Sequence, residues 1–304
     1  MYLMAEAGNA QAKQEKKPGR RLALLTFVVM ALLVFLLPET EAALSILFPG
    51  IQQAGNQNLK SLLSLPLTLL LPAVLIALWY LRKTGESFRD FFRLRGFSLL
   101  AALLILLIAV SLPFVINQVI KWSDSVFGKS GVMEMVAVQP DGKAGFLAQA
   151  GNFVNTLLLL ALLPGICEEM VFRGAFLSLS RDSGVKALWW GVLLNALLFA
   201  LFHKSLARLP YTLVLGLVLS LVVYLTGSVP AGILLHTLYN FLYVLAFALD
   251  ARQYAWVAAL STLVRDTVSL PLALLGAAVV AAALYGLWKM HGNQQKRPGA
   301  APGR

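Results

Sequence analysis

The most restrictive feature of the sequence is its division into eight apolar stretches, most of them about 16 to 21 residues long, the length that crosses a hydrocarbon layer of roughly 30 Å. Short polar segments separate them, and 59% of all residues are hydrophobic while only 13% are charged. The stretches are unbroken rather than alternating in polarity, which excludes a membrane β-barrel. The sequence therefore predicts an all-α polytopic membrane protein with about eight transmembrane helices. The expected spans are Leu22–Leu37, Leu62–Leu81, Phe97–Ile116, Phe153–Leu179, Ala187–Phe202, Pro210–Leu225, Val229–Leu249 and Leu270–Leu287.

The positive charge of the chain is best explained by membrane topology. The formal net charge is +11, but the basic residues lie in the tails and between the apolar stretches, without the aromatic interleaving of a nucleic-acid surface. Most of the 25 Lys and Arg residues fall on the side of the two tails, which the positive-inside rule places in the cytoplasm. We therefore expect an integral protein of a bacterial inner membrane with both termini cytoplasmic, in contact with membrane lipids and not with nucleic acid.

The same pattern divides the chain into segments. The first apolar stretch is expected to remain as a helix and not to be cleaved as a signal peptide. It is long, and the segment that follows it, Pro38-Glu39-Thr40-Glu41, is a poor cleavage site. The segment from Phe88 to Arg95 alternates Phe with Arg, which favours a short helix in the cytoplasmic interface or, alternatively, a simple topogenic anchor. The expected segments are a cytoplasmic basic N-tail (1–21), helices 1–3 with the interfacial helix and loops (22–145), a catalytic core of helices 4–7 (146–250), a loop and helix 8 (251–290), and a disordered C-tail (291–304).

Three of the expected spans contain residues that are costly to place in a bilayer. An ionisable group there costs roughly 2.5–3.5 kcal/mol on insertion scales, so such groups usually face a protein interior or a hydrated cavity. The fourth span carries Glu168, Glu169 and Arg173, the fifth ends at His203, and the seventh carries His236 and Asn240.

The helical spacing of these residues suggests separate tasks. Glu169 and Arg173 are four residues apart, in the favourable order for an ion pair, whereas Glu168 lies about 100° away around the helix. One carboxylate is then neutralised, and the other is free for chemistry. His236 and Asn240 are also four apart and share one helix face.

Each motif alone is compatible with helix packing, but packing does not explain all of them together. A carboxylate and an imidazole can activate water, and a second imidazole with an amide can stabilise an oxyanion, which indicates a hydrolase. Glu168, His203 and His236 are equally the ligand types of a catalytic zinc site. The sequence has neither His-Glu-x-x-His nor Gly-x-Ser-x-Gly, so both mechanisms stay open at this point.

Three motifs of this sequence resemble, in their order and spacing, those of the CPBP family of intramembrane proteases. They are Glu168-Glu169-x-x-x-Arg173, Phe199-x-x-x-His203 and His236-x-x-x-Asn240. This family includes CAAX prenyl endopeptidases of the Rce type and bacterial bacteriocin-processing and immunity proteins. The resemblance covers about residues 153–249 and implies an eight-helix fold with a hydrated cavity. It implies that Glu168 activates water with help from His203, that His236 and Asn240 form the oxyanion site, and that Glu169 and Arg173 support them.

The resulting hypothesis is an intramembrane endopeptidase that hydrolyses a membrane-anchored or hydrophobic peptide. We favour a glutamate-type mechanism without a cofactor, although the family has also been classed as metalloproteases and zinc is the alternative. The competing hypothesis is a non-catalytic transporter, receptor or assembly factor that uses the polar cluster as a proton relay or binding site. Cys167 is interpreted as a packing residue. Bringing the groups to one depth is expected to need helix tilt, a break at Pro164-Gly165, or a later helix start.

Overall fold

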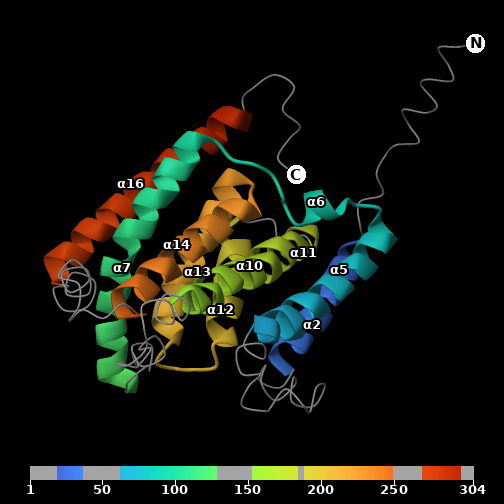
Figure 1. Ribbon diagram of the computed structural model, residues 1–304. Coiled ribbons are helices and arrows are strands. Elements are labelled where there is room, and N and C mark those ends of the chain that lie inside the picture. The colour runs from blue at the N-terminus through green and yellow to red at the C-terminus, as the bar shows by residue number, and fades with distance from the viewer. Residues whose placement is uncertain (1–18, 37–61, 129–152, 184–187, 249–268, 296–304) are drawn as a thin grey trace, which may run out of the picture.

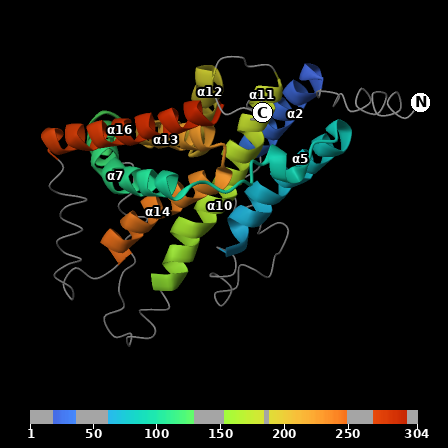
Figure 2. The same cartoon turned by 90° about the horizontal axis from the view of Figure 1, so that it is seen from above.

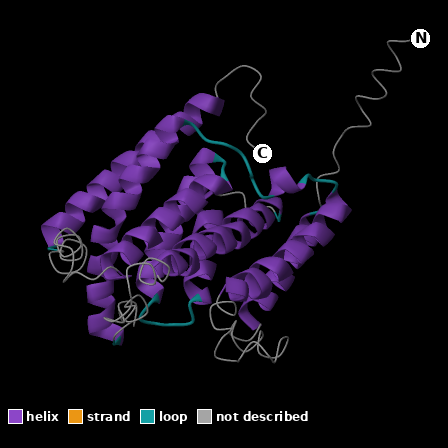
Figure 3. Cartoon of the chain, viewed as in Figure 1, coloured by secondary structure: helices purple, strands orange, loops and turns teal. Residues whose placement is uncertain are grey.

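The computed structural model describes residues 19–36, 62–128, 153–183, 188–248 and 269–295. Within these ranges the chain forms helices, turns and loops and no strand (Figure 3). The helices are α2 (Arg20–Leu36), η3 (Pro66–Leu70), α5 (Leu71–Thr84), α6 (Phe88–Phe91), α7 (Leu99–Phe127), η4 (Leu158–Leu162), α10 (Leu163–Glu169), η5 (Met170–Phe176), α11 (Leu177–Asp182), α12 (Leu188–Phe202), α13 (Leu209–Thr226), α14 (Val229–Ala248) and α16 (Leu270–Gln295). The η elements are π-helical turns inside longer helices.

The helices that carry the candidate residues lie in the middle of the bundle. Figure 1 shows α7 and α16 side by side at one edge and α2 and α5 side by side at the other, with α10 to α14 between them. Figure 2 gives the same grouping from above. α14 packs against both α7 and α10, and α12 packs against α13. Side chains from α10, η5, α12, α13 and α14 can therefore meet in the interior.

Each predicted span corresponds to a helix, with differences at the ends. In the part of the chain that the structure describes, five helices are long and apolar enough to cross a membrane: 62–84, 99–127, 153–182, 209–226 and 270–293. Trp190–Phe202 and Val229–Leu245 are shorter apolar helices. The third helix continues to Phe127 instead of ending at Ile116, and the last continues to Gln295 instead of Leu287. Contacts with neighbouring segments stabilise the added turns: Ser123 is buried and donates to the Ala207 carbonyl, and His291 Nδ1 lies near the Leu225 carbonyl. The expected N-tail and the two longest loops lie outside the described residues.

The fourth helix is not broken at Pro164-Gly165. It runs without interruption from Phe153 to Asp182 and widens into π-helical turns at η4 and η5, on either side of the two glutamates. Proline lacks an N–H and its ring clashes with the carbonyl four residues earlier. The wide turn just before Pro164 accommodates that defect, so the helix continues where the sequence suggested a break.

Hydrogen bonds join helix ends that the alternating topology predicts on one side of the membrane. The Tyr80 hydroxyl donates to Asp182 at 3.1 Å, and the Nδ1 of His291 lies 3.1 Å from the Leu225 carbonyl. The opposite ends are joined where the Ser123 hydroxyl donates to the Ala207 carbonyl at 2.7 Å. These contacts agree with helices that cross the bilayer in alternating directions.

The segment from Phe88 to Arg95, expected as a short interfacial helix or a topogenic anchor, begins with the short helix α6 and packs inward. Phe91 and Phe92 are fully buried, and only Phe88 is partly exposed. The Phe92 ring lies so close to Gly174 that a Cβ there would be 2.6 Å from it, and Ser178 donates to the Phe91 carbonyl at 2.6 Å. Because Gly174 has no side chain, the Phe92 ring has room to pack against the fourth helix. This segment therefore covers the helix that carries Arg173.

Candidate functional site

The fourth helix places an ion pair in the centre of the protein. Arg173 Nη1 lies 2.7 Å from Glu169 Oε1, and both side chains are fully buried. The predicted pairing is therefore present, although Arg173 belongs to the π-helical turn η5. Burying two charges is tolerable only when their remaining polar atoms are also satisfied. Arg173 meets this condition by donating from Nη2 to the Gly216 carbonyl at 3.2 Å, whereas Glu169 Oε2 is buried without a hydrogen-bond partner among the described residues.

His236 of α14 lies between the two glutamates. Its Nδ1 is 3.0 Å from Glu169 Oε1, a hydrogen-bonding distance, and its Nε2 is 3.9 Å from Glu168 Oε2. Because Glu169 is paired with Arg173 it is a carboxylate and can only accept, so Nδ1 of His236 must donate. The Nε2 edge of the ring then faces Glu168, which lies beyond hydrogen-bonding distance and is 8% exposed.

His203 joins this group through a shared aromatic neighbour. The Phe199 ring contacts His203 with a centroid distance of 4.9 Å and His236 with one of 5.9 Å. The Arg173 guanidinium lies 4.4 Å from the same ring. The Nδ1 of His203 lies 2.9 Å from the Phe199 carbonyl. His203, predicted at the end of its span, thus follows directly after α12 and faces the cluster.

Asn240 is the one predicted site residue for which the structure gives no contact with the others. It is half-buried on α14, four residues after His236, and its amide makes no hydrogen bond within the described residues. The structure thus brings together Glu168, Glu169, Arg173 and His236 directly, and His203 through Phe199. Asn240 shares only the helix face of His236.

The sequence analysis missed two buried polar residues that contact the cluster from neighbouring helices. Ser220 of α13 is 0% exposed and lies 3.4 Å from Arg173 Nε. Asn195 of α12 is 2% exposed, accepts from Ser220 at 3.1 Å and donates to the Phe172 carbonyl. An asparagine in an otherwise apolar span is a signal that could have indicated Asn195, whereas a single serine could not have indicated Ser220.

Gly232 of α14 has no side chain, and the Glu169 carboxylate occupies the space beside it. A Cβ at Gly232 would lie 2.7 Å from Glu169 Oε2 and 2.5 Å from the Val223 side chain. Gly232 therefore sets how closely α14 approaches the fourth helix and α13.

Gly232→Ala should lower the free energy of unfolding by about 1–3 kcal/mol, since the added methyl group overpacks a site next to a buried carboxylate. Thermal unfolding in detergent measures this. Gly191→Ala is the matched control, because a Cβ there would meet its nearest atom, the Ser180 hydroxyl, at an ordinary 3.4 Å. Equal melting temperatures for the two variants would contradict the close approach at Gly232.

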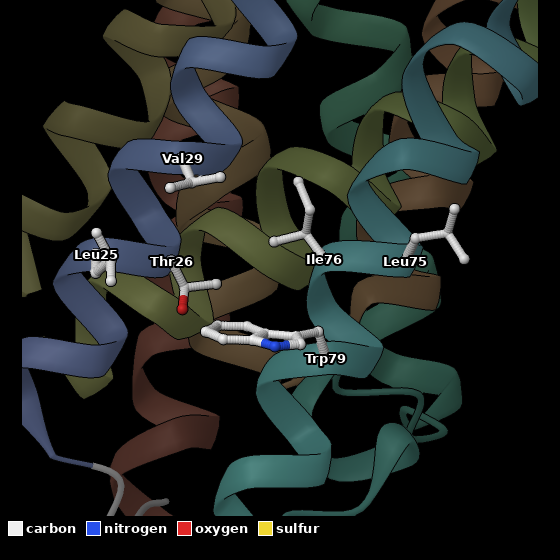
Figure 4. Close-up of a pocket in the computed structure, with 6 residues that line it drawn as sticks. All are labelled: Leu25, Thr26, Val29, Leu75, Ile76 and Trp79. Carbon is white, nitrogen blue, oxygen red and sulfur yellow. The ribbon is translucent and has the colours of Figure 1, made fainter.

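A separate cavity of about 430 Å³ lies between α2 and α5, away from the polar cluster (Figure 4). Its lining is apolar except for Thr26, whose hydroxyl bonds to the Leu22 carbonyl of its own helix. The lining residues are Leu25, Thr26, Val29, Leu75, Ile76 and Trp79. This cavity has no acid, base or charged group, so it cannot perform hydrolysis, and the candidate active site is the polar cluster.

A metal ion bound in the polar cluster would need several ligand atoms at short distances from one point. Glu168, His203 and His236 are the expected zinc ligands of the alternative mechanism, and zinc needs ligand atoms at about 2.0–2.2 Å. Within the described ranges no group of three or more His, Cys, Asp or Glu side chains is arranged to hold a metal ion. The Nδ1 atoms of both histidines are already engaged by oxygen atoms of the protein.

Together, the helices and the buried polar cluster define an all-α polytopic membrane protein with an ionisable site in its core. Residues 150–242 match the family described as type II CAAX prenyl endopeptidase Rce1-like. This match contains all three motifs and confirms the family resemblance inferred from them.

One curated relative is an uncharacterized 24.3 kDa protein of Escherichia coli, which is 32% identical over 88 residues. The alignment covers 28% of this chain and 41% of the relative, so the chain spans about two fifths of that protein's length. No solved structure matches the chain significantly.

Proposed function

We propose that the protein is an intramembrane endopeptidase of the CAAX-protease type, which hydrolyses a peptide bond of a membrane-anchored or hydrophobic substrate. The observation that carries this proposal is the position of His236, held by Glu169 at Nδ1 and facing Glu168 with Nε2. A carboxylate that can take a proton from water, beside an imidazole that can donate to an oxyanion, is suited to hydrolysis. The match over residues 150–242 supports the same conclusion.

In this proposal Glu168 is the general base. It is the carboxylate without an arginine partner, and it keeps a small exposed area while Glu169 has none. It takes the proton of the attacking water, and His203, which shares the Phe199 ring with His236, helps to orient that water. The proton then passes to the leaving amine, so that hydrolysis is complete without any change in the net charge of the site.

His236 is the proposed oxyanion donor. Two carboxylates and one guanidinium leave the buried cluster with one net negative charge, which a proton on His236 would balance. Both ring nitrogens then donate: Nδ1 to Glu169, and Nε2 to the developing oxyanion. Arg173 and Glu169 hold the ring in this orientation.

Asn240→Ala should lower kcat by about 10²- to 10³-fold with little change in KM, as for the loss of one oxyanion donor. The amide is half-buried, four residues from His236 and without a bond to the described residues, so it is available to substrate. Steady-state kinetics in proteoliposomes measures the effect. A rise in KM with unchanged kcat would instead assign Asn240 to substrate binding.

We propose that the reaction needs no metal, and activity should survive dialysis against phenanthroline, with less than one zinc ion per chain by elemental analysis. An amide is a poor zinc ligand but a good oxyanion donor, so a role of Asn240 in turnover would favour the metal-free mechanism. Stoichiometric zinc, with activity lost on its removal and restored on its return, would overturn the glutamate mechanism and leave the peptidase assignment intact.

The proposed function is tested with purified protein in proteoliposomes and a panel of membrane-anchored peptides in H₂¹⁸O. A peptidase releases fragments in which a single ¹⁸O atom enters the new carboxyl terminus. The competing hypothesis of a proton relay predicts intact peptides and a proton flux that a pH-sensitive dye inside the vesicles detects. The proposed orientation, with both tails in the cytoplasm, is tested by labelling single cysteines introduced into the tails.

A further inference from the structure

The Glu169–Arg173 pair is connected to two neighbouring helices by a continuous chain of buried hydrogen bonds. From the pair, the chain continues through Arg173 Nε to Ser220 at 3.4 Å and from Ser220 to Asn195 at 3.1 Å. Asn195 then donates to the Phe172 carbonyl, which belongs to η5 together with Arg173. The path therefore leaves the fourth helix at Arg173 and returns to it one residue earlier.

This closed path resists rotation of the arginine. A guanidinium has five N–H donors in a fixed plane, and an arginine side chain otherwise has high rotamer freedom. Here Nη1 is directed to Glu169, Nη2 to the Gly216 carbonyl and Nε to Ser220, while the plane lies against Phe199. These three hydrogen bonds and the contact with the Phe199 ring together hold the guanidinium in one orientation.

The second end of the path stabilises the wide turn. The Phe172 carbonyl accepts from the Leu177 backbone N–H, five residues later, and also from Asn195. A π-helical turn is uncommon and occurs often at functional sites. Asn195 attaches this turn to α12, the helix that precedes His203.

We propose that Ser220 and Asn195 are positioning residues, which fix Arg173 and thereby hold the Glu169 carboxylate and the His236 ring in the geometry used for catalysis. This inference rests on the proposed function, and neither residue touches the expected position of substrate. Their effect passes through Glu169, whose Oε1 is shared by Arg173 Nη1 and His236 Nδ1. When Arg173 is free to turn, that shared oxygen moves and the Nδ1–H bond of His236 weakens.

The charged and titratable groups around His236 are few, which makes this bond measurable. They are Glu168 and Glu169 from the fourth helix, Arg173 through Glu169, and His203 after α12. The whole chain has 3 histidines, so ¹⁵N-histidine labelling gives few signals, and His236→Gln identifies the one that belongs to this ring.

The test compares wild type, Ser220→Ala and Asn195→Ala in two measurements. In the NMR spectrum of the labelled protein, wild type should show a downfield His236 Nδ1–H signal that exchanges slowly with water, and both variants should exchange at least tenfold faster. In the peptide assay, kcat should fall about 10- to 100-fold in both variants, with KM changed less than twofold.

Ser178→Ala is the matched control, because Ser178 is another fully buried serine whose hydroxyl donates to a carbonyl, that of Phe91. It should lose stability as Ser220→Ala does, but keep the wild-type Nδ1–H signal and kcat. The proposal is overturned if Ser220→Ala and Asn195→Ala keep the wild-type signal, or if Ser178→Ala shifts it equally. If the peptidase assignment fails, wild type cleaves nothing, yet the NMR comparison still decides the positioning role.

Discussion

Replacing Glu168 with glutamine should reduce peptide cleavage by about 10²- to 10⁴-fold, the contribution of a general base, while the protein still inserts and folds. Glutamine has nearly the same shape but cannot take a proton from water. Glu168 has no arginine partner, so its replacement leaves the Glu169–Arg173 ion pair intact. Removing an ionisable group from a span also lowers its insertion cost. Cleavage rate and melting temperature, measured on the same preparation, separate loss of chemistry from loss of fold.

The control for this variant is its neighbour in the sequence. Cys167 is 1% exposed and packs in the apolar core, so Cys167→Ala should keep cleavage near the wild-type rate. Glu168→Gln retaining more than a tenth of the activity would remove Glu168 from the role of base. Loss of activity in Cys167→Ala with an unchanged melting temperature would point to the thiol instead.

Glu169→Ala should be the most destabilising single substitution in the cluster, at about 3–5 kcal/mol, because it leaves the Arg173 guanidinium buried without its counter-charge. Cleavage should be lost as well, since His236 loses the acceptor at Nδ1. Chemical or thermal unfolding of the purified protein measures the first effect, and the peptide assay measures the second.

Two comparisons make this expectation specific. The Asp90–Arg95 pair has the same 2.7 Å separation but is about half exposed, so Asp90→Ala should cost at most about 1 kcal/mol. Hydrogen bonds from Arg95 and Ser87 hold the pKa of Asp90 below its usual value, so that pair is fully charged at neutral pH. The double variant Glu169→Leu/Arg173→Met should recover much of the stability and none of the activity. Equal costs at Asp90 and Glu169 would show that burial does not control the strength of the central pair.

The parts of the fold and of the site that depend on local sequence patterns could be predicted from the sequence. Apolar stretches determine where a chain can cross a bilayer, and a helix lies at each predicted span, although the third and the last helix extend past their expected ends. Among the described residues, five of these helices are long and apolar enough to cross a membrane. The pairing of Glu169 with Arg173 was also predictable, because their spacing of four brings side chains together on any helix. These are properties of segments that can be judged without knowing what packs beside them.

The features that depend on contacts between distant segments were not predictable. The sequence left a break at Pro164-Gly165 as one of three ways to bring the groups to one depth. The structure instead has a continuous helix with π-helical turns on either side of the two glutamates. The inward packing of Phe92 depends on Gly174, which lies far away in the sequence. The part played by Ser220 emerges only when α13 is placed against η5.

The Phe199 ring links the effects of substitutions at three other residues of the site. Arg173, His203 and His236 come from three different segments, yet all of them contact this one side chain. Substitutions at residues that share a neighbour are not additive in their energies. A change at Phe199 therefore alters the ion pair and both imidazoles at once, and a tolerated change at any one of them depends on the other three. The four residues form a single epistatic unit, in which each residue restricts the evolutionary paths open to the rest.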